Sequence, residues 1–165
     1  MSIGRIIRHI VASPWTLRKM LPADALKRIE DAIGRSENTH RGEIRFAVEV
    51  DLNAIQILRG VSPRDRALDV FSQLKVWDTE ENTGVLIYLL LADRQIEIVA
   101  DRGIHKKVGD EAWINIANHI ESAFRAGRYE DGVIKGLEEV TKLLSTHFPA
   151  KAENRDELSN KPVVL

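Results

Sequence analysis

The chain has 165 residues, with 24 Lys and Arg against 25 Asp and Glu, and its formal net charge at pH 7 is −1. A charge so close to zero creates no field that would attract nucleic acid, and the absence of cysteine excludes disulfides, thiolate zinc sites and cysteine nucleophiles. The longest apolar run, residues 85–92, is far shorter than the roughly 20 residues of a transmembrane helix. We therefore expect a soluble cytoplasmic protein without a transmembrane segment or a nucleic-acid partner.

Residues 1–21 are predicted to form an N-terminal amphipathic helical segment. Isoleucines recur at helical spacing on one side, and Arg5, Arg8 and His9 lie on the other. Pro14 interrupts this pattern. A basic amphipathic helix can lie on a membrane surface, which would make the protein peripheral to the membrane, but a packed or dimer-forming helix is the interpretation that we favour for so short a segment.

Residues 22–149 carry the periodic patterns of one folded domain. The expected elements are, in chain order, a helix at 22–35, a strand at 43–51, a helix that starts at Ser62-Pro63, strands at 84–92 and 95–101, and helices at 110–126 and 129–146. The strand at 43–51 alternates apolar and polar residues and is expected to be half-buried. The strand at 84–92 is apolar on both faces, which is typical of the middle of a sheet.

These elements predict the fold class, a three-layer α/β/α sandwich around a small mixed sheet. The central strand is expected at about 85–91. A right-handed crossover makes 44–50 its parallel neighbour, and a tight hairpin makes 95–100 its antiparallel neighbour. Residues 150–165 have no apolar stripe, and we expect them to form a disordered tail.

Several short motifs resemble those of the TPM domain family. They are the Asn82-Thr83-Gly84-Val85-Leu86-Ile87 hairpin start, the Asp93-Arg94 turn, the Arg102-Gly103-Ile104 loop, and the turn from Gly127 through Tyr129 to Gly132. The resemblance covers roughly Gly42 to Phe148 and is strongest to short soluble bacterial members. It implies a small α/β domain related to those of thylakoid, bacterial-envelope and membrane-associated proteins. Some of these look like metal-binding assembly or repair factors, and some have been assigned acid phosphatase activity.

Four carboxylates are candidate ligands for a metal at one end of the sheet: Asp78, Glu80, Asp101 and Asp110. The antiparallel hairpin returns Asp101 to the level of the loop before Gly84, and the next helix starts at the same end. Hard cations such as Ca²⁺ or Mg²⁺ prefer several oxygen ligands. The alternative is that the acidic residues are simply solvated, and that Asp110 interacts with a helix dipole.

The same place allows a second interpretation, an anion site. Arg102, His105, Lys106 and Lys107 precede a helix N-terminus, whose free N–H groups attract anions. His105 could then act as a general acid or base. No phosphate-binding or phosphatase motif accompanies these residues, and no catalytic residue is assigned.

Together these observations predict a TPM-domain protein that binds a divalent metal, Ca²⁺ or Mg²⁺, and acts as an interaction or assembly factor for an unidentified protein partner. The alternative implied by the resemblance is a metal-assisted acid phosphatase, that is, a phosphomonoesterase. The two differ in whether the protein hydrolyses a phosphate ester.

Overall fold

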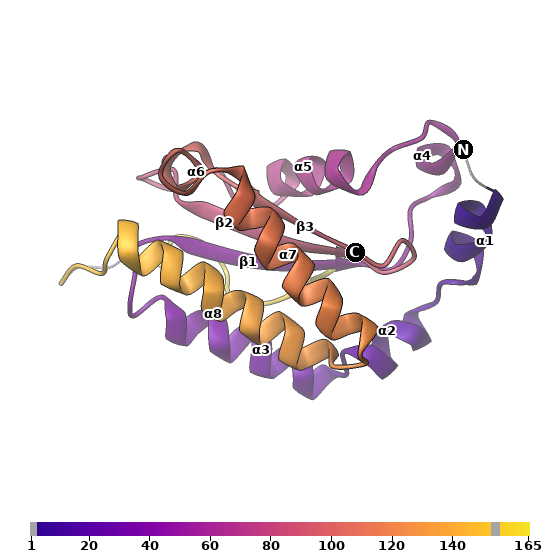
Figure 1. Cartoon of the computed structure of the whole chain (residues 1–165), viewed down its shortest axis with the longest axis horizontal. Helices are drawn as coiled ribbons and strands as arrows, with labels where there is room; N and C mark the ends of the chain where they lie inside the picture. Colours follow the sequence, from indigo (N-terminus) through magenta and orange to yellow (C-terminus); the bar gives the residue numbers. More distant parts are fainter. Residues whose placement is uncertain (1–2, 153–155) are drawn as a thin grey trace.

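The computed structural model describes residues 3–152 and 156–165, and it places a four-stranded mixed sheet between helices (Figure 1). The elements are α1 (Ile3–Val11), α2 (Pro14–Met20), α3 (Ala23–Ser36), β1 (Glu43–Glu49), α4 (Ala54–Leu58), α5 (Pro63–Gln73), β2 (Gly84–Leu90), β3 (Gln95–Ala100), α6 (Arg102–Val108), α7 (Asp110–Arg125), α8 (Tyr129–His147) and β4 (Val163–Val164). The strand order is β3-β2-β1-β4.

The pairing of the three main strands is the expected one. β2 is parallel to β1, with Glu43 opposite Gly84, and antiparallel to β3, with Val85 opposite Ala100. Every residue of β2 is buried, because helices cover both faces of the sheet. The α/β/α sandwich and its central strand are therefore confirmed.

The two helical layers differ in size (Figure 1). α3, α7 and α8 cover one face, where the larger core cluster includes Ile33, Phe46 and Leu89. α5 packs on the other face over a smaller cluster that includes Val70 and Tyr88. Alternate residues of β2 thus serve two separate cores, as a pleated strand requires.

Gly84 lets the hairpin start where it does. A Cβ at this position would lie 1.8 Å from the carbonyl oxygen of Val76, a distance that no side chain tolerates. The segment after α5 therefore crosses directly over the start of β2, as strand glycines often permit.

The C-terminal segment corrects the prediction of a disordered tail over 150–165, of which residues 153–155 lie outside the described residues. Val163 and Val164 pair with β1 as strand β4, and the N–H of Leu165 donates to the oxygen of Val48 at 2.9 Å. Backbone pairing with a free sheet edge needs no apolar stripe, and for this reason the composition did not reveal it.

β1 is also more buried than its alternating pattern predicts. All seven of its residues are buried, although three of them are Glu43, Arg45 and Glu49. The C-terminal segment covers one end of the polar face, through bonds to Glu43. Arg66 of α5 covers the other end through Glu49.

Some helix boundaries also differ from the expectation. The N-terminal segment consists of two helices, α1 and α2, and its residues 1–2 lie outside the described residues. Pro22 caps α3 instead of forming its first turn. Residues 102–108, expected as a loop, form α6, because the Asp101 carboxylate caps a helix there. α4 was not expected at all.

Within 3–152 and 156–165, none of the helices combines the length and the apolarity needed to cross a bilayer.

Candidate metal centre

Asp101 lies where the topology predicted it, at the end of β3 beside the loop before Gly84. Its N–H donates to the oxygen of Gly84 at 2.8 Å, and the N–H of Gly103 donates to the oxygen of Asn82 at 2.9 Å. A Cβ on Gly103 would lie 2.3 Å from the oxygen of Glu81, so only glycine allows this contact. One carboxylate oxygen of Asp101 accepts a hydrogen bond from the N–H of Arg102 at 2.7 Å.

The other three predicted ligands face solvent. Asp78 and Glu80 are exposed in the loop, and the side chain of Asp110 is 83% exposed, with an oxygen 3.6 Å from Nε2 of His105. In the described part of the chain, these carboxylates and Asp101 do not form a group whose ligand atoms lie within 4.8 Å of one another. Metal binding by Asp78, Glu80, Asp101 and Asp110 stays a prediction.

A different group of carboxylates meets at the same end of the sheet. One ligand oxygen each from Glu37, Glu43 and Asp156 lies within 4.8 Å of the others, and the described ranges contain no second group of three. Glu37 follows α3, Glu43 opens β1, and Asp156 belongs to the C-terminal segment. We call these three residues the acidic cluster.

Burial shapes the electrostatics of the acidic cluster. The residue Glu43 is 2% exposed, and its burial raises the pKa of its carboxyl to about 7, against the lowering effect of N–H groups from Glu157 and Leu158. Burial likewise raises the pKa of Glu37 to about 7, and the neighbouring charge of Glu43 adds to the rise. The side chain of Asn160 donates to Glu37 at 2.9 Å and opposes this rise.

The acidic cluster has the chemistry of a hard-cation site. Its ligand atoms are carboxylate oxygens, the type that Ca²⁺ and Mg²⁺ prefer. Like charges held close together raise one another's pKa values, and a bound cation would relieve that repulsion. Ca²⁺ takes six to eight oxygen ligands, so three carboxylates would leave positions for water or a partner's oxygens.

Sequence reasoning missed all three members of the acidic cluster. Asp156 fell in the segment expected to be disordered, and Glu37 was an ordinary residue after a helix. Glu43 offered one usable signal. It shares a face of β1 with Arg45 and Glu49, and three charged residues on one face of a strand next to the central strand are unusual in a sheet covered on both sides.

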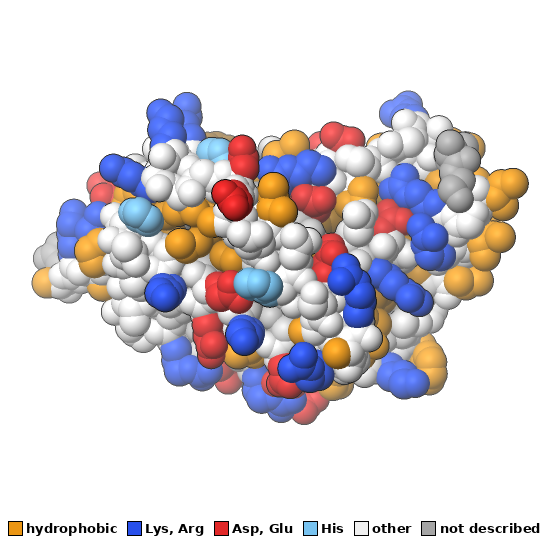
Figure 2. Space-filling view, viewed as in Figure 1, with side chains coloured by type: hydrophobic (Ala, Val, Ile, Leu, Met, Phe, Trp, Pro, Cys, Tyr) orange, Lys and Arg blue, Asp and Glu red, His pale blue; other side chains and the backbone are white. Residues whose placement is uncertain are grey.

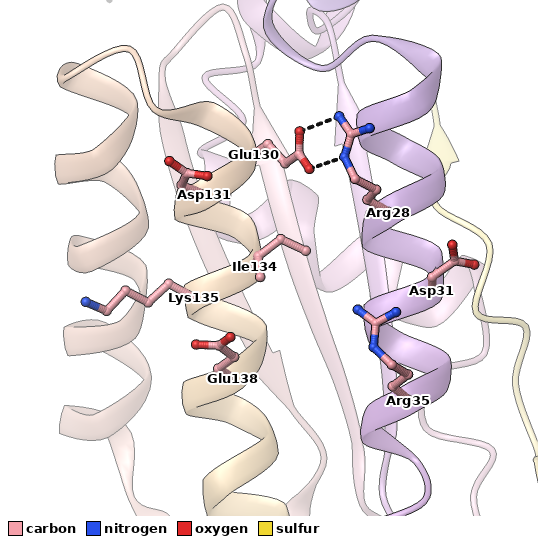
Figure 3. A pocket seen from close by; sticks show the side chains of 8 residues that line it. All are labelled: Arg28, Asp31, Arg35, Glu130, Asp131, Ile134, Lys135 and Glu138. Carbon is pink, nitrogen blue, oxygen red and sulfur yellow. Dashed lines mark hydrogen bonds and ion pairs between the residues drawn. The ribbon is translucent and has the colours of Figure 1, made fainter.

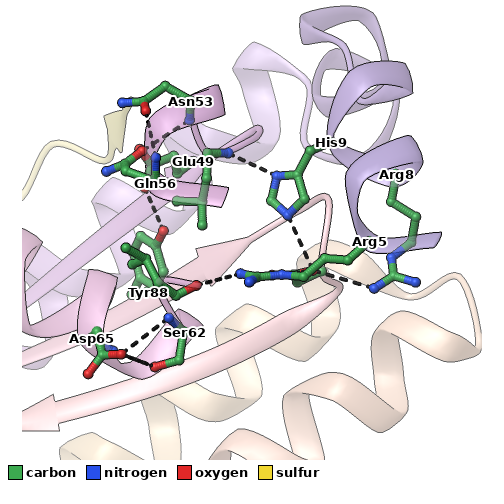
Figure 4. A network of polar contacts seen from close by, with 12 residues as sticks. Arg5, Arg8, His9, Glu49, Asn53, Gln56, Ser62, Asp65 and Tyr88 are labelled. Carbon is green, nitrogen blue, oxygen red and sulfur yellow. Dashed lines mark hydrogen bonds and ion pairs between the residues drawn. The ribbon is translucent and has the colours of Figure 1, made fainter. Parts of the chain in front are cut away.

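The other end of β1 holds a compensated network of polar side chains (Figure 4). Glu49 accepts two hydrogen bonds from Arg66, at 2.8 and 2.9 Å, and a third from the hydroxyl of Tyr88. Burial and the Glu49 carboxylate raise the pKa of Tyr88 above its usual range, so the tyrosine stays protonated and donates. This end is built for stability, because its charge is paired.

A groove lies between α3 and α8 (Figure 3). Arg28 and Glu130 bridge it, with Nη2 and Oε2 2.8 Å apart. Its other lining residues include both signs of charge and one isoleucine, Ile134. Ligand pockets are mostly apolar, so this charged and open groove does not look like a small-molecule site.

The basic residues of the predicted anion site lie within helix α6 and not in a loop. Asp101 caps α6, and the helix N-terminus that was expected to bind an anion belongs to α7, whose first turn carries Asp110 and Glu111. His105 pairs with Asp110 on the surface.

Fold and cluster together define a small α/β/α domain with a four-stranded mixed sheet and carboxylates gathered where β1 and β2 begin. A family model described as the TPM domain matches residues 17–143. The chain therefore belongs to the TPM domain family, which confirms the resemblance seen in its motifs.

Solved structures of other proteins resemble this fold. The BA42 protein from the psychrophilic bacterium Bizionia argentinensis is 34% identical with a TM-score of 0.78, and the match covers 88% of this chain and 95% of that one. The N-terminal domain of a P. gingivalis protein is 22% identical with a TM-score of 0.59, over 78% of this chain and 79% of that one, and supports the fold alone. No curated protein matches the chain.

Proposed function

We propose that this TPM-domain protein binds a hard divalent cation, Ca²⁺ or Mg²⁺, through the acidic cluster of Glu37, Glu43 and Asp156. One observation carries the proposal: ligand oxygens of Glu37 and Glu43 lie within 4.8 Å of each other and of an oxygen of Asp156, which comes from the distant C-terminal segment. A cation is the natural partner for such a group.

Protons and cations would compete for this site. With pKa values of about 7, Glu37 and Glu43 are partly protonated near neutral pH. A metal ligand has to be deprotonated, so binding would release protons and strengthen as the pH rises.

The bound cation would act on the C-terminal segment. Asp156 belongs to this segment, and its neighbours Glu157 and Leu158 donate backbone N–H groups to Glu43. A cation held by all three carboxylates would therefore fasten the segment to β1 and α3. This gives a physical basis for a metal-responsive interaction or assembly factor, in which the position of the segment decides whether a protein partner binds.

The test is a calorimetric titration of the full chain with Ca²⁺ and with Mg²⁺ at about pH 8, together with thermal unfolding. Binding to the folded form should add roughly 2.7 kcal/mol of stability at a hundredfold excess over Kd. Glu43→Gln should remove most of this gain while preserving the fold. Glu138→Gln, at an exposed glutamate of α8, is the matched control and should behave like the wild type.

A third variant separates the two candidate sites. Asp101→Asn should leave the gain intact if the acidic cluster binds the cation. Loss of binding in Asp101→Asn, but not in Glu43→Gln, would instead favour Asp78, Glu80, Asp101 and Asp110. A wild-type chain that neither cation stabilises would refute the proposal. Cation-dependent hydrolysis of a chromogenic phosphate ester would make the protein a phosphomonoesterase.

A further inference from the structure

Helix α1 is attached to the domain through its polar side (Figure 4). The ring of His9 is buried, with Nδ1 accepting the N–H of Leu52 at 3.0 Å and Nε2 lying 3.3 Å from a carboxylate oxygen of Asp93. Arg5 donates to the same Asp93 carboxylate and to the oxygen of Val61 at 2.7 Å. These contacts fix which side of α1 faces the domain.

The apolar residues of α1 face outward, except Ile6, which packs against the smaller core. α1 lies beside α4, because His9 and Arg5 bind residues just before and just after α4. The α1–α4 edge consists of the exposed apolar residues of α1, α2 and α4, which are between 54% and 76% exposed: Ile3, Ile7, Ile10, Val11, Trp15, Ile55 and Leu58. Figure 2 shows hydrophobic side chains gathered at the side of the molecule where Figure 1 places α1.

This arrangement reverses the usual one for a surface helix. An amphipathic helix normally buries its apolar stripe against the core and keeps charged residues in water. A contiguous exposed apolar patch marks a surface that another body covers. The paired Arg5 and His9 show that the outward side is determined by specific contacts.

Positive charge lies beside the α1–α4 edge, although Arg5 and Arg8 pair with Asp93. From residue 3 to residue 23 the sequence has four Arg and Lys residues and no Asp or Glu, although the whole chain has a net charge of −1. Arg18 and Lys19 are exposed on α2, and Nζ of Lys19 lies 5.6 Å from the ring centre of Trp15. Arg59 is exposed directly after α4.

We propose that the α1–α4 edge docks on an anionic lipid surface. Its isoleucines and Trp15 would enter the interface, where tryptophan is favoured. Arg18, Lys19 and Arg59 would contact the phosphate groups. Charge complementarity favours this occupant over a second copy of the chain, because two such edges would bring like charges together. The proposal is independent of the acidic cluster.

Vesicle flotation of the full chain tests the proposal, with neutral phosphatidylcholine compared with vesicles that contain about 30% phosphatidylglycerol. The chain should float with the anionic vesicles, and salt should weaken the binding. Ile7→Ser/Ile10→Ser should lower binding by about tenfold or more, since two inserted side chains are lost. Arg18→Gln/Lys19→Gln should remove the preference for anionic vesicles.

The matched control is Ile114→Ser, at an isoleucine of α7 that is 58% exposed and lies outside the edge. It should bind like the wild type, and thermal unfolding should show that every variant is folded. The proposal would be overturned if the wild-type chain floated with neither kind of vesicle. It would also be overturned if Ile114→Ser lowered vesicle binding as strongly as Ile7→Ser/Ile10→Ser. A third result would also overturn it: a wild-type chain that does not bind vesicles but sediments as a dimer, which Ile7→Ser/Ile10→Ser dissociates. The α1–α4 edge would then contact a second copy of the chain.

Discussion

β1 begins and ends with a buried glutamate, Glu43 and Glu49, and both lie on the same face of the strand. The two carboxylates differ in the groups that surround them. Glu49 receives the guanidinium of Arg66 and the hydroxyl of Tyr88. Glu43 accepts hydrogen bonds from the backbone N–H groups of Glu157 and Leu158, and two further carboxylates, Glu37 and Asp156, lie beside it. Arg45 lies between them, yet its Nε and Nη1 form no hydrogen bond with the described residues.

The difference separates a structural charge from a candidate functional one. A buried carboxylate needs a partner, because burying an isolated charge is costly. The protein supplies that partner to Glu49 from its own chain. For Glu43 it supplies further negative charge, and this is the pattern expected where a cation from solution completes the site.

Breaking the compensated end should have the largest effect. Arg66→Met leaves Glu49 buried without its cation, and we expect a loss of about 3 kcal/mol in the free energy of unfolding, measured by urea denaturation. Adding Glu49→Gln to Arg66→Met should restore much of this loss, because the unpaired charge disappears. A single variant as stable as the wild type would show that the Glu49–Arg66 pair does not govern this end.

Removing the C-terminal segment should have the next largest effect. Deletion of residues 156–165 removes β4, one member of the acidic cluster and the N–H groups bound to Glu43. We expect a fall of about 5 °C in Tm, equivalent to roughly 2 kcal/mol. Deletion of 163–165 alone should cost less. An unchanged Tm in the longer deletion would mean that the segment contributes nothing to the folded state.

The pH dependence of stability should report on the uncompensated end. Glu37 and Glu43 have pKa values of about 7 in the folded protein, against an ordinary value of 4.5. The folded state therefore holds more protons between these values, and stability without metal should fall as pH rises from about 5 to about 8. Thermal unfolding in the presence of a chelator measures this fall.

Glu43→Gln is the control for that profile. It removes one titrating carboxyl, so its Tm should fall less than that of the wild type over the same pH range. Ca²⁺ should restore the stability of the wild type at the higher pH but not that of the variant. Parallel pH profiles would show that Glu43 does not titrate there.

The smallest effect is expected at the surface pair in the groove between α3 and α8. Arg28→Gln breaks the bonds to Glu130 and Asp24, but exposed ion pairs contribute little because water and salt screen them. Tm should stay within about 1 °C of the wild type. A clear drop would mean that this exposed pair matters as much as the buried pair of Glu49 and Arg66.

The sequence by itself determined the architecture. The two-faced apolarity of residues 85–91 identified the central strand, and the crossover and hairpin rules fixed its neighbours. Ser62 indicated the start of α5, where the structure shows a capping box with Asp65. These features depend on residues close together in the chain, and local chemistry is enough to specify them. The same rules placed Asp101 beside the loop before Gly84.

Only the tertiary structure decided which charged groups meet. The acidic cluster joins residues 37 and 43 to residue 156, and no periodicity relates the first two positions to one so far away. The outward side of α1 depends on contacts between its polar side and Asp93, about 90 residues later, against the general rule that apolar stripes face inward. The β4 pairing depends on a sheet edge that a two-residue strand can occupy. Each outcome was set by long-range backbone or charge complementarity, which the pattern of apolar residues does not encode.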